Sequence, residues 1–171
     1  ESLLPSLPLP SSASVLDVGC GVGTYVRLLG GLGHRAVGLD YSQASLERAL
    51  ASDPGRKGSY LTGEAYALPF PGESFHLVVS IGVLQVLESP ERALNEMVRV
   101  LKPGGFLVTE MLNNRSAATR LQRNLDLVIE KSRAVIKEAA EIFWASLIIF
   151  KKVGRDRVAV IGRQDDFGVR G

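Results

Sequence analysis

The sequence has a single cysteine and no long hydrophobic run, and each scarcity excludes a class of protein. One cysteine cannot build an internal disulfide framework or a zinc site that needs several cysteines. The longest uninterrupted apolar stretch covers residues 142–150, whereas a membrane-spanning helix needs about 20 residues. The first residues also lack the basic region and the apolar core of a signal peptide. We therefore expect a cytoplasmic protein without a membrane span.

An excess of charge of one sign is absent as well, because the formal net charge at pH 7 is +2 over 171 residues. Binding to the phosphates of nucleic acid needs a stronger basic field, so we do not expect a nucleic-acid partner. Basic residues do outnumber acidic ones after Arg115, which fits the solvated face of a helix and a hairpin and leaves RNA as an alternative partner. Hydrophobic residues make up 46% of the chain, enough to bury the core of one domain.

Short apolar segments alternate with segments of helical periodicity as far as Leu112. Strands are expected at residues 15–18, 36–39, 58–64, 75–82 and 106–112. Helices are expected between them, with Ser42 and Ser89 as N-caps, Pro90 at a first helical position, and the stretch from Lys102 to Gly105 as a stop. This alternation predicts an α/β fold with a parallel sheet and helices on both faces.

The last third of the chain has a different pattern. An amphipathic segment over residues 117–143 predicts a helix or helix pair that covers the sheet, with a partner-binding helix as the alternative. Two strand-like runs follow, Leu147 to Val153 and Arg157 to Gly162, joined by a tight turn that contains glycine. Such a pair predicts an antiparallel hairpin rather than another crossover unit.

The chemistry of the sequence concentrates in the stretch VLDVGCGVGTYVRLL, where an apolar run meets a cluster of glycines. Gly19 and Gly21 lack side chains that would hold a ligand away from the backbone, and Gly23 lets the next helix pack close to the strand. Asp40 follows about 20 residues later, where a carboxylate accepts hydrogen bonds from ribose hydroxyls. The turn and the acid together predict a ligand that contains adenosine.

The spacing of the turn distinguishes between such ligands. The third glycine, Gly23, comes one residue earlier than in the G-x-G-x-x-G pattern of dinucleotide sites. Asp17, at the end of the first strand, is a poor neighbour for a pyrophosphate and a good one for an ammonium or sulfonium group. These two features favour a nucleoside cofactor that carries an amino acid.

Four segments between Ser14 and Leu112, in this order and spacing, resemble class I S-adenosylmethionine-dependent methyltransferases of the small-molecule type related to quinone biosynthesis: VLDVGCGVGTYVRLL, VGLDYS, GEAYALPFPGESFHLVVSIGVLQVLESPERAL and EMVRVLKPGGFLVTE. The resemblance implies a Rossmann-like, mostly parallel sheet of seven strands that ends in an antiparallel C-terminal hairpin. It also implies transfer of a methyl group from S-adenosylmethionine to an O, N or C atom of a small molecule, with S-adenosylhomocysteine as product.

On this resemblance we divide the single domain, residues 1–171, into four parts. They are a solvated leader at 1–13, a cofactor-binding core at 14–112, a helical substrate-side segment at 113–145 and a closing hairpin at 146–164. Relatives usually carry helices before the first strand that close over the site. Fewer than about fifteen residues precede the strand here, so we expect either an open site or a lid outside this sequence.

The resemblance also implies roles for individual residues in cofactor binding. The turn at Gly19–Gly21 would line the methionine and ribose, Tyr41 would pack near the adenine, and Glu64 would face its amino group. Backbone groups of Ala65 would meet the adenine ring, and those of Ser80 and Ile81 the methionine. The full set of expected cofactor-binding residues is Asp17, Gly19, Cys20, Gly21, Asp40, Tyr41, Glu64, Ala65, Ser80 and Ile81.

No catalytic residue and no metal ligand is assigned from the sequence. His76 stands where the family often has Asp, and Gln85 and Val86 stand where it often has His, which leaves a non-catalytic cofactor-binding or scaffold protein as an alternative. We expect Cys20 to be a small filler of the turn. His34 and His76 are expected at the amino ends of strands, opposite the ligand.

Three residues are candidates to meet the substrate. Glu110 is expected at the carboxyl end of the fifth strand, where the ligand edge of an open sheet lies, and it is the strongest of the three. Gln85 and Tyr66 are the others.

Overall fold

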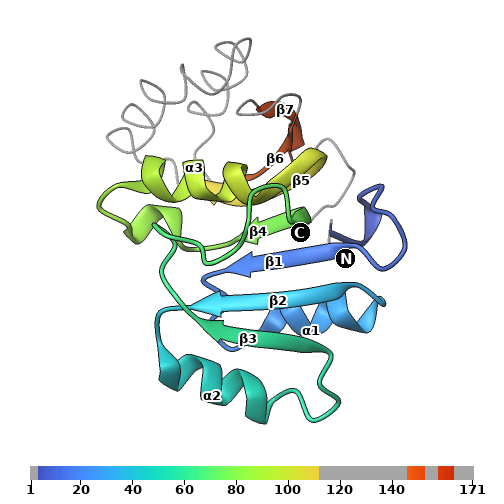
Figure 1. Ribbon diagram of the computed structural model, residues 1–171, viewed down its shortest axis with the longest axis vertical. Coiled ribbons are helices and arrows are strands. Elements are labelled where there is room, and N and C mark those ends of the chain that lie inside the picture. The colour runs from blue at the N-terminus through green and yellow to red at the C-terminus, as the bar shows by residue number, and fades with distance from the viewer. Residues whose placement is uncertain (1–3, 112–145, 153–157, 164–171) are drawn as a thin grey trace.

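The structure is a computed structural model that describes residues 4–111, 146–152 and 158–163, and its centre is a parallel β-sheet (Figure 1). Five strands pair in parallel in the order β3-β2-β1-β4-β5. Their bounds are β1 Ser14–Val18, β2 Arg35–Asp40, β3 Gly58–Thr62, β4 Phe75–Ser80 and β5 Leu101–Met111. The predicted α/β, Rossmann-like parallel sheet is confirmed.

Two later strands run beside β5. Strand β6, Ser146–Lys152, pairs antiparallel with β5 and brings Ile149 opposite Val108. Strand β7, Val158–Arg163, pairs antiparallel with β6. The expected helical segment at residues 113–145 and the turn between these strands lie outside the described residues.

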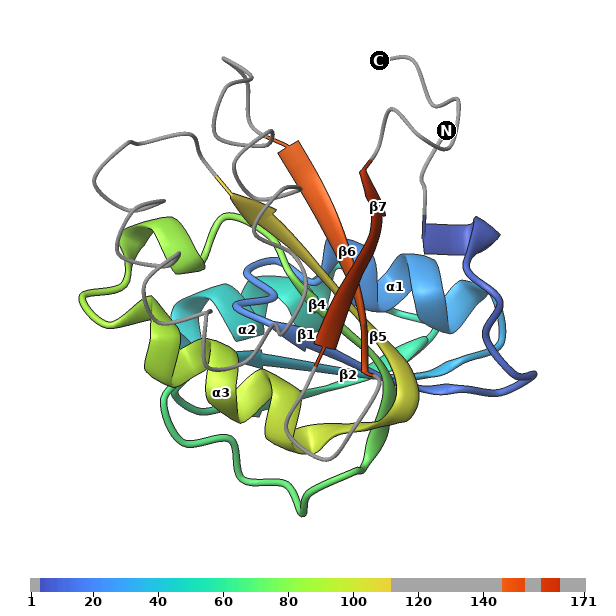
Figure 2. The same ribbon diagram turned by 90° about the horizontal axis from the view of Figure 1, so that it is seen from above.

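Helices cover both faces of the sheet, as the alternating pattern predicts (Figures 1 and 2). Helices α1, Thr24–Gly31, and α2, Gln43–Ala51, pack on one face, and helix α3, Pro90–Val100, packs on the other. Each face has its own buried apolar cluster, because the side chains of β1 alternate: Val15 joins the α1 face and Leu16 the α3 face. Two short 3-10 helices, η1 at Leu4–Ser6 and η2 at Leu84–Val86, complete the described elements.

The helix ends largely follow local sequence. Ser42 is the N-cap of α2, and its hydroxyl accepts a hydrogen bond from the Ser45 N–H at 3.3 Å. Pro90 opens α3 and Ser89 is its N-cap residue, although the Ser89 side chain makes no capping hydrogen bond. Helix α3 ends at Val100 and β5 begins at Leu101, so the stop predicted at Lys102 to Gly105 lies inside a strand. The pairing of β4 with β5 is irregular there, between the Phe75–Leu101 and Leu77–Phe106 pairs.

The N-terminal segment is not the solvated leader that we expected. Leu4 and Leu7 are buried and belong to the apolar cluster on the α1 face, together with Ala13. The prolines between them, Pro5 and Pro8, are exposed. The leucines contribute apolar area to a face that two short helices leave partly uncovered, and this tertiary gain outweighs the polar composition of the segment.

The order of the strands places a crevice at one end of the sheet. From β1 the chain moves outward through β2 to β3, then returns to the other side of β1 with β4. Ligands of open α/β sheets bind where the strand order reverses, outside the carboxyl ends of the strands. Here that point lies between β1 and β4. None of the helices in the described part of the chain is long and apolar enough to cross a bilayer.

Candidate functional site

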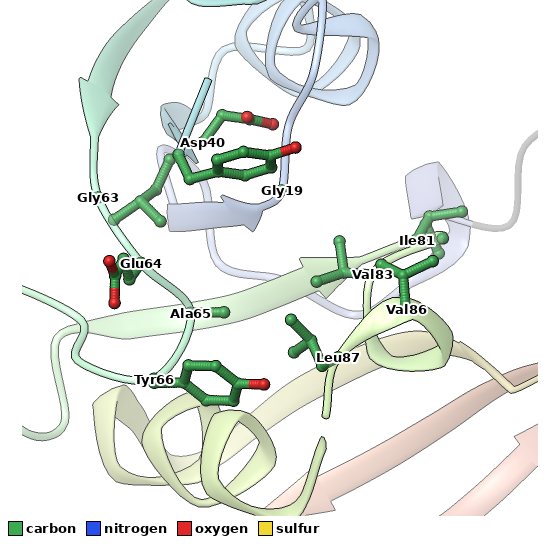
Figure 3. A pocket seen from close by; sticks show the side chains of 13 residues that line it. Gly19, Asp40, Gly63, Glu64, Ala65, Tyr66, Ile81, Val83, Val86 and Leu87 are labelled. Carbon is green, nitrogen blue, oxygen red and sulfur yellow. The ribbon is translucent and has the colours of Figure 1, made fainter. Parts of the chain in front are cut away.

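A cavity of about 440 Å³ opens at the carboxyl ends of β1, β2 and β4 (Figure 3). Six of the residues expected to bind the cofactor line it: Gly19, Asp40, Tyr41, Glu64, Ala65 and Ile81. Four others, Asp17, Cys20, Gly21 and Ser80, do not line it. The structure therefore gathers the adenosine-side residues around one cavity and leaves most of the methionine-side residues beside it.

Several lining residues had no predicted role in binding the cofactor. The loop after β4 contributes an apolar wall, which faces the wall formed by Glu64, Ala65 and Tyr66 (Figure 3). This apolar wall consists of Gly82, Val83, Val86 and Leu87, and Val86 is 75% exposed. The side chains carry no polar chemistry that a motif could have revealed. Their position depends on η2, a short 3-10 turn that helical periodicity does not detect.

Asp40 connects the second strand to the glycine turn. Its Oδ2 accepts a hydrogen bond from the Gly21 N–H at 2.8 Å, and its Oδ1 accepts one from the Ser42 N–H at 2.9 Å. An ionised carboxylate has about four acceptor positions, so each oxygen keeps one for a ribose hydroxyl. The carboxylate predicted to bind ribose therefore also shapes the turn.

The glycines of the turn are needed for different reasons. A Cβ on Gly19 would lie 2.1 Å from Cγ2 of Val83, so Val83 occupies the space that was assigned to a ligand. A Cβ on Gly23 would lie 2.6 Å from the ring of Tyr60 in β3, which corrects the reason given for this glycine. A Cβ on Gly21 would meet nothing within 4 Å. Of the three, Gly21 is the one beside open space.

Asp17 is buried beside this turn with one oxygen unused. Its side chain is 2% exposed, and Oδ2 has no hydrogen-bond partner among the residues that the structure describes. Burial, and secondarily the charge of Asp40, raise the pKa of Asp17 to about 7. An unpartnered buried carboxylate oxygen is costly, and it is a natural acceptor for a ligand cation with N–H donors.

Ser80 and Cys20 lie deeper than expected. The Ser80 carbonyl accepts a hydrogen bond from Thr109 Oγ1 at 2.9 Å, and its own hydroxyl is buried without a partner. Cys20 is buried against Gly38. Burial and the charges of Asp17 and Asp40 raise the pKa of Cys20 to about 12, which disfavours the thiolate form.

The two histidines have structural roles at the opposite end of the sheet. The Ala13 N–H donates to Nδ1 of His34 at 3.2 Å, and the Ser14 N–H donates to Nδ1 of His76 at 3.0 Å. Burial, followed by the charges of Lys102 and Arg35, lowers the pKa of His76. Their predicted position away from the ligand edge is confirmed.

Tyr25, in the first turn of α1, is a candidate site residue that the sequence analysis did not identify. Burial raises the pKa of its hydroxyl, and the charges of Asp17 and Glu110 raise it further. Tyr25 therefore lies in the electrostatic field of both carboxylates, at the same edge as the cavity. The sequence did not indicate this role, because Tyr25 belongs to a stripe of apolar residues at helical spacing, and such a stripe predicts a core residue.

Over the parts of the chain that the structure describes, no group of three or more His, Cys, Asp and Glu side chains could hold a metal ion. The class of protein that this fold and this site define is a Rossmann-like domain for a ligand that carries adenosine. Six of the ten expected site residues line the cavity; of the other four, Asp17, Cys20 and Ser80 are buried and Gly21 is partly exposed.

Comparison with known proteins places the domain in a family. The methyltransferase domain family matches residues 16–109. The 2-phytyl-1,4-naphtoquinone methyltransferase of Thermosynechococcus vestitus is 40% identical over 104 residues, which are 58% of this chain and 46% of the relative. The malonyl-[acyl-carrier protein] O-methyltransferase of Erwinia pyrifoliae is 33% identical over 146 residues, 82% of this chain and 55% of the relative. Among solved structures, the PH0226 protein of Pyrococcus horikoshii matches with a TM-score of 0.61 and 29% identity, over 71% of this chain and 58% of that chain.

The chain belongs to the methyltransferase domain family. It spans about half the length of the two relatives named above. The described residues fit the methyl donor of this family on two observations: the unpartnered Oδ2 of Asp17 and the open space beside Gly21.

Proposed function

We propose that the protein transfers a methyl group from S-adenosylmethionine to an O, N or C atom of a small molecule. The observation that carries the proposal is the position of the buried, unpartnered Asp17 carboxylate beside a cavity of about 440 Å³ at the switch point of the sheet. A nucleoside that bears an ammonium group would satisfy both features with one molecule.

In this proposal different residues bind different parts of the methyl donor. Asp40 holds the ribose hydroxyls, while Tyr41, Glu64 and Ala65 surround the adenine. Asp17 takes the ammonium. Two groups of predicted residues complete the site: Gly19, Cys20 and Gly21 shape the turn under the ligand, and Ser80 and Ile81 border its methionine part.

The donor supplies an electrophilic methyl group on a sulfonium centre when it is bound. The protein then has to orient the acceptor and exclude water, and such positioning can contribute about 7 to 11 kcal/mol without a dedicated base. The apolar wall after β4 excludes water from one side of the cavity. Glu110 lies near the carboxyl end of β5, outside the lining of the cavity, and its charge helps to raise the pKa of Tyr25; we propose it as a group that accepts a proton from the acceptor.

We propose a quinone-type ring as the acceptor. The apolar side chains of Ile81, Val83, Val86 and Leu87 support a hydrophobic ring rather than a charged acceptor. The two relatives described above are named for a phytyl naphthoquinone and for malonyl-[acyl-carrier protein], and the apolar wall favours the first class.

The remaining organisation is proposed with the activity. We propose a single domain over residues 1–171, with the substrate-side segment at 113–145 and a sheet of seven strands closed by the hairpin at 146–164. The antiparallel register of β6 with β5 and with β7 supports this closure. A cytoplasmic location stays a prediction from the sequence.

The first test is calorimetric titration with S-adenosylhomocysteine, with NAD as the control ligand. We expect micromolar binding of the first ligand and none of the second. The variant Asp40→Ala should reduce affinity at least about 30-fold, because a charged hydrogen-bond acceptor is lost. Glu47→Ala, at an exposed position on α2, is the matched control. Undiminished affinity in Asp40→Ala would overturn the proposed site, and turnover with a naphthoquinol acceptor would establish the reaction.

A further inference from the structure

One wall of the cavity is formed by an irregular loop with no helix or strand of its own. The β3–β4 loop, residues 63–74, contributes Gly63, Glu64, Ala65 and Tyr66 to the lining. Within the loop, the Ala67 N–H donates to the Glu64 carbonyl at 3.2 Å and the Phe70 N–H donates to the Leu68 carbonyl at 2.8 Å. These two bonds are local and shape turns. The loop is joined to the sheet at its start, where the Gly63 N–H donates to the Asp40 carbonyl at 3.0 Å, and the side chain of Leu68 is buried in the core.

Helix α3 supplies polar anchors to the backbone in the middle of the loop. Glu96 and Arg99 lie three residues apart on one side of the helix, and both carboxylate oxygens of Glu96 accept from Arg99, with Nε to Oε1 at 2.6 Å and Nη2 to Oε2 at 2.8 Å. Arg99 also donates to the carbonyls of Phe70, at 2.9 Å, and Leu68, at 3.0 Å. Glu96 Oε2 accepts from the Leu68 N–H at 2.8 Å. The ion pair thus binds both backbone groups of Leu68.

The start of the same helix holds Tyr66. The phenol oxygen of Tyr66 accepts a hydrogen bond from the Ser89 N–H at 3.2 Å. The guanidinium of Arg92 lies 5.2 Å from the centre of the Tyr66 ring, within cation–π range. Arg92, Glu96 and Arg99 follow one another at helical spacing, so a single stripe of α3 contacts the loop at three points from Tyr66 to Phe70.

We infer that the Glu96–Arg99 pair is a positioning element of the donor site, which holds the Glu64–Tyr66 wall in its binding conformation. The inference rests on the proposed function, because it concerns the affinity for the methyl donor. An exposed ion pair contributes little to stability, and the side chains of Arg99 and Glu96 are 40% and 22% exposed. The bonds of this pair go to loop backbone, so its loss releases the wall rather than the fold.

A released wall must be ordered again when the ligand binds, and that cost lowers affinity. Arg99→Lys keeps the positive charge but cannot donate to Glu96 and to two carbonyls at once. Glu96→Gln keeps an acceptor for the Leu68 N–H and removes the charge. We expect affinity for S-adenosylhomocysteine to fall about tenfold in Arg99→Lys and about threefold in Glu96→Gln.

The experiment combines calorimetry with hydrogen exchange of the ligand-free protein, whose Leu68 amide reports the pair directly. Arg48→Lys, at an exposed position on α2, is the matched control. Arg99→Lys and Glu96→Gln should both speed hydrogen exchange across residues 64–70 and weaken binding of S-adenosylhomocysteine. Both should leave the melting temperature within about 3 °C of the wild type.

The failures can be told apart. Unchanged exchange in both variants would show that the pair does not hold the loop. Faster exchange with undiminished affinity would show that the loop's position does not affect the donor site. Absence of S-adenosylhomocysteine binding in the wild type would overturn the proposed function itself, while the exchange data would still report on the pair.

Discussion

The two ends of the sheet differ in whether their buried polar groups have hydrogen-bond partners. At the amino end, the imidazoles of His34 and His76 each accept a backbone N–H of the segment that leads into β1. At the carboxyl end, Oδ2 of Asp17 and the hydroxyl of Ser80 are buried without partners. Folding alone favours satisfied groups, because an unsatisfied buried polar atom costs about 1 to 3 kcal/mol. Unsatisfied groups that gather at one end therefore indicate where a ligand completes the structure.

The largest effect is expected from Asp17→Asn. The folded-state pKa of Asp17 is raised to about 7 from 3.8, so between these pH values the folded protein binds more protons than the unfolded chain. Unfolding free energy should therefore fall as pH rises from 4 to 7, by about 3 kcal/mol relative to Asp17→Asn. Urea titrations of both proteins across this range measure the difference. A constant difference would mean that Asp17 is ionised throughout.

Asp53→Asn is the control for the direction of this pH dependence of the unfolding free energy. The Lys57 N–H donates to Asp53 at 2.9 Å, and this bond contributes most to lowering the pKa of Asp53, with help from Gly58 and Tyr60. The stabilisation from Asp53 is therefore present above the unfolded-state pKa and is lost as pH falls below it. Relative to its Asn variant, the wild type should lose stability on acidification here, opposite to the behaviour at Asp17.

A smaller effect is expected from Gly19→Ala. The new methyl would overlap Cγ2 of Val83, and φ at this position is +74°, so we expect a loss of about 2 to 4 kcal/mol in unfolding free energy. Adding Val83→Ala should restore part of the loss, because it removes the overlap but not the backbone strain. Denaturation of the single and double variants measures the coupling, and strict additivity would show that the two residues do not touch in solution.

The smallest effect is expected at the amino end of the sheet, where the described buried polar groups have hydrogen-bond partners. His76→Leu removes the acceptor of the Ser14 N–H and should cost about 1 kcal/mol of unfolding free energy. The lowered pKa of His76 means that the neutral form is favoured in the fold, so the wild type should lose part of this advantage below about pH 6.5. Binding of S-adenosylhomocysteine should be unchanged, since His76 is remote from the cavity. A weakened affinity would contradict the division between the two ends.

Sequence patterns predicted the site residues whose type is itself informative, which are the acidic residues and the glycines. Asp40 and the glycine turn were predicted from their positions at strand ends and from their spacing, whereas Glu64 was predicted from the family resemblance. Tertiary context decided the rest. Val83, Val86 and Leu87 line the cavity only because a 3-10 turn folds them over it, and an aliphatic residue after a strand has no distinguishing feature.

The leucines of the N-terminal segment illustrate the same limit in the fold. Leu4 and Leu7 alternate with prolines, a composition typical of a solvated leader, yet both are buried. Local propensity describes such a segment without its neighbours. The apolar surface on the α1 face, formed by residues distant in sequence, decides where it lies.

The contact between Gly19 and Val83 also constrains how this domain can diversify in evolution. Because the turn after β1 and the loop after β4 share one small volume, a larger residue at position 19 is tolerated only when position 83 becomes smaller. The loop after β4 lines the proposed acceptor side, so a lineage that acquires a new acceptor through position 83 must do so within the space that Gly19 leaves. These two positions should therefore be inherited as a pair.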